Sequence, residues 1–236
     1  MISIKNISKN FGKHEVLKSI SLELEKGECV ALIGPNGSGK TTLIKIILGL
    51  LYATEGTVTV NGEIVGKDVA YRSIIGYMPQ MSRLPENMTV AQVFALLKRL
   101  RSDVETIDES VYKMFDIDGM KSKALGKLSG GMRQKVSAAL AFMFSPEILI
   151  LDEPTAALDP VSNENLKDKI KQEVADGKMV MITSHNLSDL DGIVSRVVYL
   201  MEGEVYFDKT IEELQASTGE ERLNRMIVES LKPQTA

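Results

Sequence analysis

Residues 34–41 form a glycine-rich stretch whose spacing is typical of a phosphate-binding loop. They read Gly-Pro-Asn-Gly-Ser-Gly-Lys-Thr and match the pattern G-x-x-x-x-G-K-[ST]. The glycines let backbone N–H groups converge on phosphate oxygens, and the helix expected to follow adds its partial positive charge. We expect Lys40 to reach the β- and γ-phosphates, the Thr41 hydroxyl to ligate Mg²⁺, and Thr42 to donate to a phosphate. The predicted nucleotide-binding residues of this loop are Gly34, Pro35, Asn36, Gly37, Ser38, Gly39, Lys40, Thr41 and Thr42.

Two adjacent carboxylates, Asp152 and Glu153, follow the apolar run 148–151. Taken alone, an acidic pair before Pro154 could simply begin a turn. In one domain with a phosphate-binding loop, Asp152 is expected to hold Mg²⁺ through water, and Glu153 to act on the attacking water as general base. The pair therefore predicts hydrolysis of a nucleoside triphosphate.

A second glycine turn comprises Ser129, Gly130 and Gly131 and stands directly before a predicted helix. Such a turn presents N–H groups at a helix start and can cradle an anion. By itself it is only an N-capped helix beginning. A chain with one phosphate-binding loop does not need two cradles, so the simplest use of the second is to cap the γ-phosphate bound by another copy of the chain.

These motifs together resemble the nucleotide-binding domain of ABC ATPases, over nearly the whole chain up to about residue 215. The Leu-Ser-Gly-Gly run at 128–131 resembles the signature sequence of that family, residues 34–42 resemble its P-loop, and residues 148–153 resemble its Walker B strand. Met132 stands where the family's usual glutamine follows the second glycine, a departure that leaves the Ser-Gly-Gly cradle unchanged.

Four further residues extend the resemblance in the order that the family keeps. Gln80 resembles the Q-loop glutamine, Asp159 lies in a D-loop-like Ala-Leu-Asp, and His185 resembles the switch histidine. Phe11 stands where the family places an aromatic ring that stacks on adenine, a role for which its π-face is suited.

The resemblance implies a role for each of these residues. Gln80 would contact Mg²⁺ and the water, and His185 would hydrogen-bond the γ-phosphate, so that both would join Glu153 in catalysis. Asp159 and the Ser-Gly-Gly turn would contact the ATP held by an opposite subunit. Two chains would sandwich two ATP molecules as a homodimer and drive a separate polytopic membrane permease.

Composition indicates which binding partners and which cellular location to expect. The net charge is −4 and the pI about 5.4, whereas a nucleic-acid binder usually carries a basic excess. One cysteine, Cys29, allows no disulfide within the chain and is interpreted as a buried thiol. No apolar stretch reaches the ~18–20 residues that cross a bilayer, and the first residues do not resemble a signal peptide. We expect a protein at the cytoplasmic face of the cell membrane, attached through its permease, with no nucleic-acid partner.

The elements that must position these residues indicate an α/β fold. The predicted architecture is a P-loop NTPase core with a mixed, largely parallel sheet, an N-terminal antiparallel β subdomain and an inserted α-helical subdomain at about 81–145. Residues 1–215 are expected to form the nucleotide-binding domain and 216–236 a C-terminal helical tail. Buried strands are predicted at 29–33, 148–151 and 179–183 and helices at 41–50, 89–101, 108–116, 132–144 and 160–176, with capping boxes at Thr89 and Thr210.

The leading hypothesis is a transport ATPase, and an iron–sulfur assembly ATPase of the same family is the alternative. A P-loop kinase or GTPase is disfavoured by the signature run and by His185. The chain resembles ATPases of exporter-type systems, which handle drugs, lipids or gliding-associated cargo or support copper-site maturation of nitrous-oxide reductase. A socket for a permease helix is expected near 81–96, and the basic cluster 98–101 is interpreted as a solvated helix end.

Overall fold

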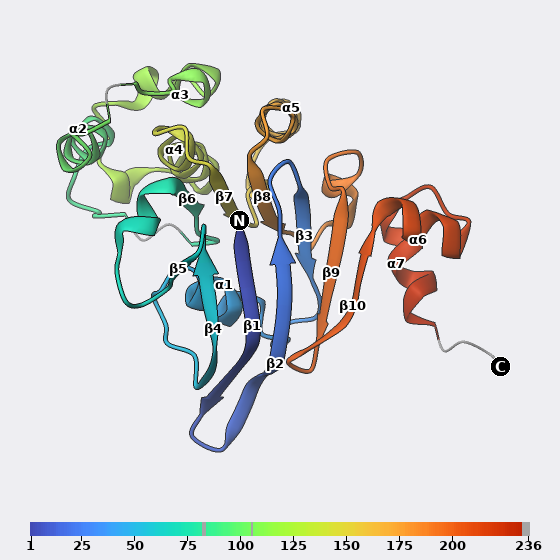
Figure 1. The fold of residues 1–236 in the computed structure, drawn as a ribbon. Coiled ribbons are helices and arrows are strands. Elements are labelled where there is room, and N and C mark those ends of the chain that lie inside the picture. Colours follow the sequence, from blue (N-terminus) through green and yellow to red (C-terminus); the bar gives the residue numbers. More distant parts are fainter. Residues whose placement is uncertain (82–83, 105, 233–236) are drawn as a thin grey trace.

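The computed structural model describes residues 1–81, 84–104 and 106–232, which are arranged as shown in Figure 1. Within them, a six-stranded sheet has the order β10-β9-β3-β8-β7-β6 and a four-stranded sheet the order β2-β1-β4-β5. The strands are β1 (Ile2–Phe11), β2 (His14–Leu24), β3 (Cys29–Ile33), β4 (Glu55–Val60), β5 (Glu63–Ile64), β6 (Ile75–Met78), β7 (Ile148–Asp152), β8 (Met179–Thr183), β9 (Arg196–Met201) and β10 (Glu204–Thr210). The expected core sheet and N-terminal antiparallel subdomain are confirmed.

The six-stranded sheet is parallel except for its last hairpin. Strand β3 pairs with β8 and β9, β7 pairs with β8 and β6, and β10 returns antiparallel to β9. Every residue of β3, β7 and β8 is buried, which explains why these strands read as continuous apolar runs. Their carboxyl ends meet at one edge of the sheet and carry the phosphate-binding loop, the acidic pair and the histidine segment.

The strand β3 divides its side chains between two hydrophobic cores, because successive residues of a strand point to opposite faces. Val30 and Leu32 belong to the core that joins the small antiparallel sheet to α1 (Lys40–Ile47). Cys29 and Ile33 belong to the core that reaches the helical subdomain. The phosphate-binding loop therefore leaves a strand that is held on both faces.

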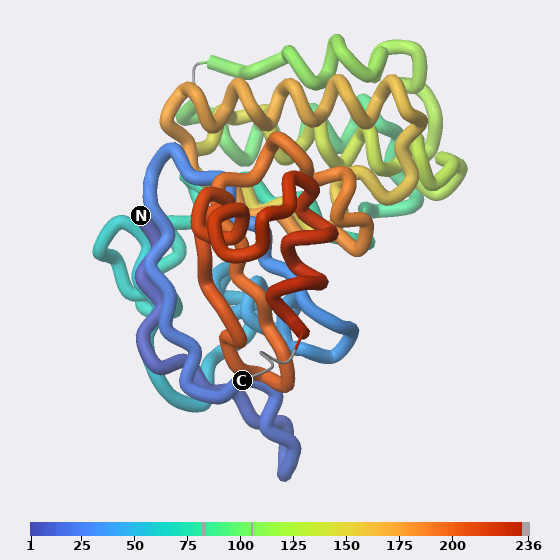
Figure 2. The backbone as a smooth tube through the Cα atoms, turned by 90° about the vertical axis from the view of Figure 1, so that its right-hand side faces the viewer, coloured from blue at the N-terminus to red at the C-terminus, as the bar shows by residue number. Residues whose placement is uncertain are grey.

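The helices gather mostly at one end of the molecule and at the β10 edge of the central sheet (Figures 1 and 2). They are α2 (Val90–Leu100), α3 (Ser110–Met114), α4 (Gly130–Phe142), α5 (Pro160–Ala175), α6 (Ile211–Thr218) and α7 (Leu223–Leu231), with short 3₁₀ turns η1 (Ala70–Ile74), η2 (Ile117–Met120), η3 (Leu125–Lys127) and η4 (Leu187–Leu190). None of the helices in the described ranges combines the length and the apolar character that a bilayer crossing requires.

Two predicted helices are shorter than the sequence indicates. The helix predicted over 41–50 stops early, because Gly49 turns into the left-handed region at φ 64°. The helix predicted over 108–116 begins only at Ser110, since an oxygen of Asp108 accepts the Ser110 N–H at 2.7 Å and keeps Asp108 outside the helix.

Side-chain caps set the starts of three other helices. The helix predicted over 132–144 begins two residues earlier, because the Ser129 hydroxyl accepts the N–H of Met132 at 3.3 Å. Thr89 and Thr210 both form the capping boxes that the sequence predicts. Capping residues therefore predict helix starts here better than apolar periodicity does.

The C-terminal helices pack on the core. Leu223, Met226 and Ile227 of α7 are buried in the core that also contains Leu190 of η4. The division of the chain into 1–215 and 216–236 stays a prediction, since α6 runs across residue 215 and contacts α7. Residues 233–236 lie outside the described part of the predicted tail.

Candidate functional site

The phosphate-binding loop connects β3 to α1 and depends on glycine for its shape. Gly39 is the N-cap of α1 at φ 105°, and a Cβ there would lie 2.5 Å from a methyl group of Leu17. The Lys40 ammonium lies inside the loop, where it donates to the carbonyls of Gly34 at 2.7 Å and Pro35 at 3.1 Å. The loop thus holds its cation beside the N-terminus of a helix, as phosphate binding requires.

A polar cavity of about 390 Å³ lies against this loop. The hydroxyl oxygen of Ser38 is buried there, and the described residues offer it no hydrogen-bond partner. A bound phosphate would supply the missing acceptor. The predicted residues that line the cavity are Asn36, Gly37, Ser38, Gly39, Lys40, Thr41, Thr42, Gln80, Asp152, Glu153 and His185.

The two carboxylates enter the cavity from the end of β7 and are held from β8. The hydroxyl of Thr183 donates to Asp152 Oδ1 at 2.6 Å. The N–H of Glu153 points to the Thr183 carbonyl at 3.2 Å and to its hydroxyl oxygen at 3.1 Å. Both acidic side chains are buried, at 6% exposure each. Their neighbours therefore hold both carboxylates in place before any ligand arrives.

Glu153 lies in the left-handed backbone region at φ 55°. A residue other than glycine pays about 1–3 kcal/mol for such a conformation, and it persists where surrounding contacts enforce it. The backbone N–H of His185 donates to Glu153 Oε2 at 3.1 Å, and its ring Nε2 lies 3.4 Å from Oε1. The carboxylate is thereby aimed at the histidine and into the cavity.

Gln134 is a site residue that the sequence analysis missed. It is buried on α4, three positions after the second glycine turn, and its Nε2 donates to the carbonyls of Glu153 at 2.8 Å and Pro154 at 3.0 Å. The sequence did contain a signal for this residue, because Gln134 is a polar side chain among apolar positions of the helix. A buried polar side chain needs a hydrogen-bond partner.

Burial and charge shift two titrating groups near the cavity. Burial lowers the pKa of Lys40, and the negative charges of Glu153 and Asp152 partly oppose that shift. Burial also raises the pKa of Tyr77 to about 12, and the charge of Asp152 adds to the shift. A ligand phosphate would add negative charge beside Lys40 and favour its protonated form.

Three predicted nucleotide-binding residues do not line the cavity: Phe11, Gly34 and Pro35. Phe11 lies at the end of β1 with 49% of its surface exposed, and the Lys9 ammonium lies 5.1 Å from its ring centre. His14, at the start of β2, is exposed and also lines the cavity.

The second glycine turn gathers with the predicted D-loop on a different surface. A Cβ on Gly131 would lie 2.8 Å from the carbonyl of Ala157, so this position has room only for glycine. Lys135 of α4 pairs with Asp159 at 2.9 Å. Hydrogen bonds from the hydroxyl of Ser162 and from Lys135 hold the pKa of Asp159 far below its usual range. None of Ser129, Gly130, Gly131 and Asp159 lines the P-loop cavity.

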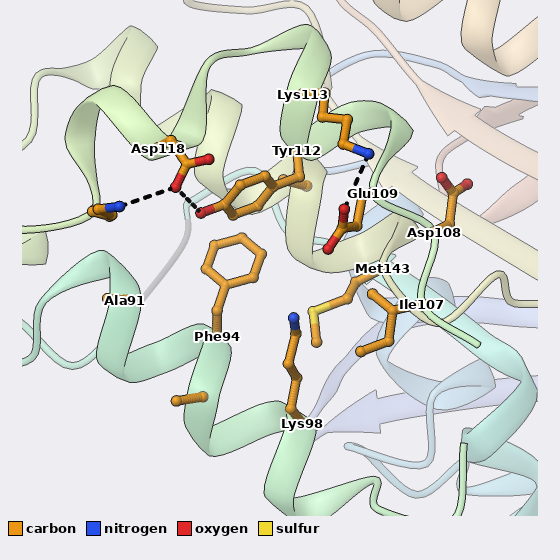
Figure 3. A pocket seen from close by; sticks show the side chains of 13 residues that line it. Ala91, Phe94, Lys98, Ile107, Asp108, Glu109, Tyr112, Lys113, Asp118 and Met143 are labelled. Atoms are coloured by element: carbon orange, nitrogen blue, oxygen red, sulfur yellow. Dashed lines mark hydrogen bonds and ion pairs between the residues drawn. The ribbon is translucent and has the colours of Figure 1, made fainter. Parts of the chain in front are cut away.

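Another cavity, of about 350 Å³, lies in the helical subdomain between α2 and α3 (Figure 3). Its charged groups largely pair with one another: Lys113 lies 3.1 Å from Glu109, and the Tyr112 hydroxyl donates to Asp118 at 3.1 Å. The ring of Phe94 meets Tyr112 edge-on with centroids 5.1 Å apart. Part of the expected socket at 81–96 lines this cavity, but no predicted catalytic or nucleotide-binding residue does, so we place the chemistry at the P-loop.

A larger apolar groove, of about 840 Å³, runs between the end of β6, α2 and α4. Leu100, which is 67% exposed, contributes to it. The other basic residues of the cluster 98–101 are exposed, as a solvated helix end requires, whereas Arg101 is half-buried. Its guanidinium donates to the Ser73 carbonyl at 3.0 Å and lies 4.9 Å from the ring centre of Phe144, so it helps to build the groove.

Comparison with known sequences finds ATP-binding proteins of ABC transporters. The sequence profile described as ABC transporter matches residues 17–156. The chain is 33% identical to the uncharacterized ABC transporter ATP-binding protein YxlF of Bacillus subtilis, over 91% of this chain and 72% of the relative. It is 35% identical to the glutamine transport ATP-binding protein GlnQ of the same organism, over 94% and 96%. It is 32% identical to the Nod factor export ATP-binding protein I of Burkholderia lata, over 86% and 68%.

Solved structures agree with the sequence comparison. The ATP-binding subunit of an ABC transporter superimposes with a TM-score of 0.89 at 28% identity, covering 98% of this chain and all of that one. A dimeric ATP-binding cassette solved in a post-hydrolysis state with ADP and Pi gives a TM-score of 0.79 at 28% identity, over 89% of this chain and 99% of that one.

These relatives support an ATPase that works as a homodimer with a separate membrane partner, and they favour transport over the iron–sulfur assembly alternative. The chain belongs to the ABC transporter family and is an ATP-binding subunit of that family.

Proposed function

We propose that two copies of this chain close around two ATP molecules and that hydrolysis in the closed dimer drives a membrane subunit. The observation that carries the proposal is the separation of the two phosphate-binding elements. The P-loop and Glu153 share one cavity, whereas the turn at 129–131 and Asp159 gather outside it. The second element can meet a γ-phosphate only on another copy, which places each ATP between two chains.

The cavity suits ATP with Mg²⁺. Thr41 offers a hydroxyl, Gln80 a side-chain carbonyl and Asp152 a carboxylate, all lining the same space. These are oxygen donors, the ligands that Mg²⁺ prefers. The buried, unpartnered hydroxyl of Ser38 and the ammonium group of Lys40 inside the loop both favour an incoming polyphosphate. When bound, Mg²⁺ would neutralise charge that develops on the phosphate oxygens.

Glu153 is proposed as the general base. A water oxygen attacks the γ-phosphorus, the bond to the bridging oxygen breaks, and the water proton passes to the carboxylate. The backbone N–H of His185 holds one oxygen of that carboxylate, and Gln134 holds the peptide behind it. The imidazole of His185 lies beside Glu153 and can donate to the γ-phosphate oxygens.

We propose the apolar groove as the docking site for a helix of the permease. The groove lies beside the expected socket at 81–96, which stays a prediction. It shares Leu84 with that range and is otherwise lined mainly by α2 after residue 96, by α4 and by β6. Residues 82–83 of the expected socket lie outside the described residues. The groove adjoins Pro79, next to Gln80, so a docked helix would touch the segment that enters the ATP cavity.

With a permease docked in the groove, we propose that the chain works at the cytoplasmic face of a membrane, where ATP is available. The cavity and the groove contain no evident cargo site, and similar relatives serve both glutamine transport and Nod factor export. We therefore assign the choice of cargo to the membrane subunit and keep export as the predicted direction.

The variant Glu153→Gln tests the proposal. Turnover should fall about 10²–10⁴-fold, as for a lost general base, while ATP binding persists and ATP-bound dimers accumulate. Glu147→Gln is the matched control, because Glu147 pairs with Lys26 on the surface at 3.3 Å and should leave turnover unchanged. Normal hydrolysis by Glu153→Gln would show that another group is the base.

The membrane step has its own test. The tagged chain, purified from detergent-solubilised native membranes, should retain a polytopic protein at stoichiometric yield. Leu100→Glu, which puts a charge into the apolar groove, should release that protein while ATP hydrolysis by the isolated chain continues. Retention of the partner by Leu100→Glu would place the docking site elsewhere.

A further inference from the structure

Asp189 makes two side-chain contacts that no motif of the sequence explains. It lies in η4, four residues after His185. Its Oδ2 accepts a hydrogen bond from the Thr155 hydroxyl at 2.9 Å, and its Oδ1 accepts one from the Asn163 side-chain amide at 3.3 Å. One carboxylate therefore joins the segment after β8 to two other segments of the chain.

Each donor belongs to a segment with a proposed catalytic role. Thr155 is buried at 8% exposure, two residues after Glu153, and its carbonyl accepts the N–H of Leu158 at 3.1 Å. Asn163 lies in the first turn of α5, where its N–H donates to the carbonyl of Asp159, the N-cap of that helix, at 2.9 Å. The base segment and the D-loop segment thus converge on the same carboxylate.

We infer that Asp189 is a positioning residue. It holds the segment of His185 against the segment of Glu153 and against the D-loop segment at the start of α5. The direct link between His185 and Glu153 consists of one backbone hydrogen bond and a ring contact at 3.4 Å. His185 itself is exposed, so its segment needs an anchor elsewhere. Hydrogen bonds to a carboxylate are about twice as strong as neutral ones, which suits Asp189 to that task.

Through these hydrogen bonds, a movement at the proposed dimer contact can reach the catalytic residues. Asp159 is proposed to touch the opposite subunit, and a shift of the first turn of α5 would pull on Asn163. Asp189 would pass the shift to His185 and, through Thr155, to Glu153. Closure of two chains would then align histidine and base together.

The neighbouring Asp191 supplies a matched control. Its Oδ1 accepts the backbone N–H of Leu223 at 2.9 Å, so it caps the start of α7 and not a catalytic segment. Asp189→Ala and Asp191→Ala each remove one carboxylate from the same short stretch. Only the first is expected to misplace the histidine.

The inference rests on the proposed function, so the test measures kcat and KM for ATP together with binding of a fluorescent ATP analogue. Asp189→Ala should lower kcat about 10- to 100-fold, the scale expected for misaligned catalytic groups, with KM and analogue binding within about twofold of the wild type. Asp189→Asn, whose amide oxygen can still accept from Thr155, should recover part of the loss. Asp191→Ala should keep the wild-type kcat.

A double-mutant comparison separates positioning from folding. Thr155→Val removes only the hydroxyl and keeps the shape, so it serves even if Asp189→Ala folds poorly. Thr155→Val should lower kcat, and adding it to Asp189→Ala should cause little further loss, because both remove the same link. Independent losses that multiply, or a kcat for Asp189→Ala equal to that of Asp191→Ala, would overturn the inference. Absence of hydrolysis by the wild-type chain would instead overturn the proposed function.

Discussion

The side-chain amide of Gln134 donates to the backbone carbonyl of Glu153 at 2.8 Å, and so joins the helix after the Ser-Gly-Gly turn to the peptide of the proposed base. The same amide donates to Pro154 at 3.0 Å. Both carbonyls belong to a backbone that has turned left-handed at Glu153. The contact therefore holds the signature helix and the strained base peptide as one unit within a subunit.

Gln134→Leu should destabilise the fold and slow hydrolysis. The change leaves buried carbonyls without their donor, which costs about 1–3 kcal/mol, and frees the Glu153 peptide to relax. Urea unfolding gives the stability change, and steady-state assays should show a lower kcat at nearly constant KM. Gln172→Leu on the exposed face of α5 is the control and should change stability by less than about 0.5 kcal/mol. A kcat unchanged in Gln134→Leu would exclude a role for this contact in catalysis.

Ser129→Arg should prevent closure of the dimer without preventing ATP binding by one chain. The arginine would project from the second glycine turn into the space proposed for the other copy's γ-phosphate. In a Glu153→Gln background, light scattering should show ATP-dependent dimers, and the added Ser129→Arg should leave monomers that still bind an ATP analogue. Ser122→Arg, exposed in the same subdomain, should still dimerise. Dimers formed by Ser129→Arg would contradict the proposed contact between subunits.

Local sequence was sufficient to predict the parts of the site that are themselves local. The P-loop is a continuous run whose glycine spacing sets its backbone, and the acidic pair follows a strand that its apolar residues identify. The three central strands β3, β7 and β8 also followed from buried runs, because parallel strands covered on both faces contain little else.

Contacts between distant segments could not be predicted in this way. Gln134 reaches Glu153 across 19 positions and Asp189 reaches Thr155 across 34, and nothing near either polar residue indicates its partner. Nothing in the sequence around His14 indicates that it lines the cavity, where the start of β2 brings it. Helix ends shifted where Gly49 or a capping side chain outweighed periodicity.

Cys29 should resist thiol reagents in the native protein. Burial raises the pKa of its thiol to about 12, whereas an unfolded cysteine titrates near ~8.5. Because the folded-state pKa is the higher one, the stability linked to this group is fully present below about pH 8.5 and is lost as the pH rises toward 12. At pH 8, a chromogenic disulfide reagent should label the native protein only as it unfolds and label it at once in denaturant. Rapid labelling of the native chain would contradict this burial.

Lys169→Met should destabilise the protein strongly. Lys169 is buried at 7% exposure and pairs with Asp108 at 2.9 Å and with Glu173 at 2.5 Å. Burial alone lowers the pKa of Lys169, but its hydrogen bonds to Glu173 and Asp108 raise it above the ordinary value. Removing one partner of a buried pair costs about 3–5 kcal/mol, measurable by urea unfolding. Lys171→Met, whose partner Asp168 lies 3.7 Å away on the surface, should cost less than about 1 kcal/mol.

The place of β3 within the sheet has a consequence for synthesis on the ribosome. In the described structure this strand pairs with β8 and β9, which begin only at Met179 and Arg196. A nascent chain therefore exposes its P-loop strand, unpaired and wholly apolar, until β8 and β9 have been synthesised. Strand β8 lies between β3 and β7 and is incomplete until Thr183 has emerged. Before that point the ATP cavity is not formed, and ATP cannot stabilise the emerging domain. ATP can therefore assist the folding of this region only after Met179–Thr183 has been synthesised, and earlier segments depend on other protection against aggregation.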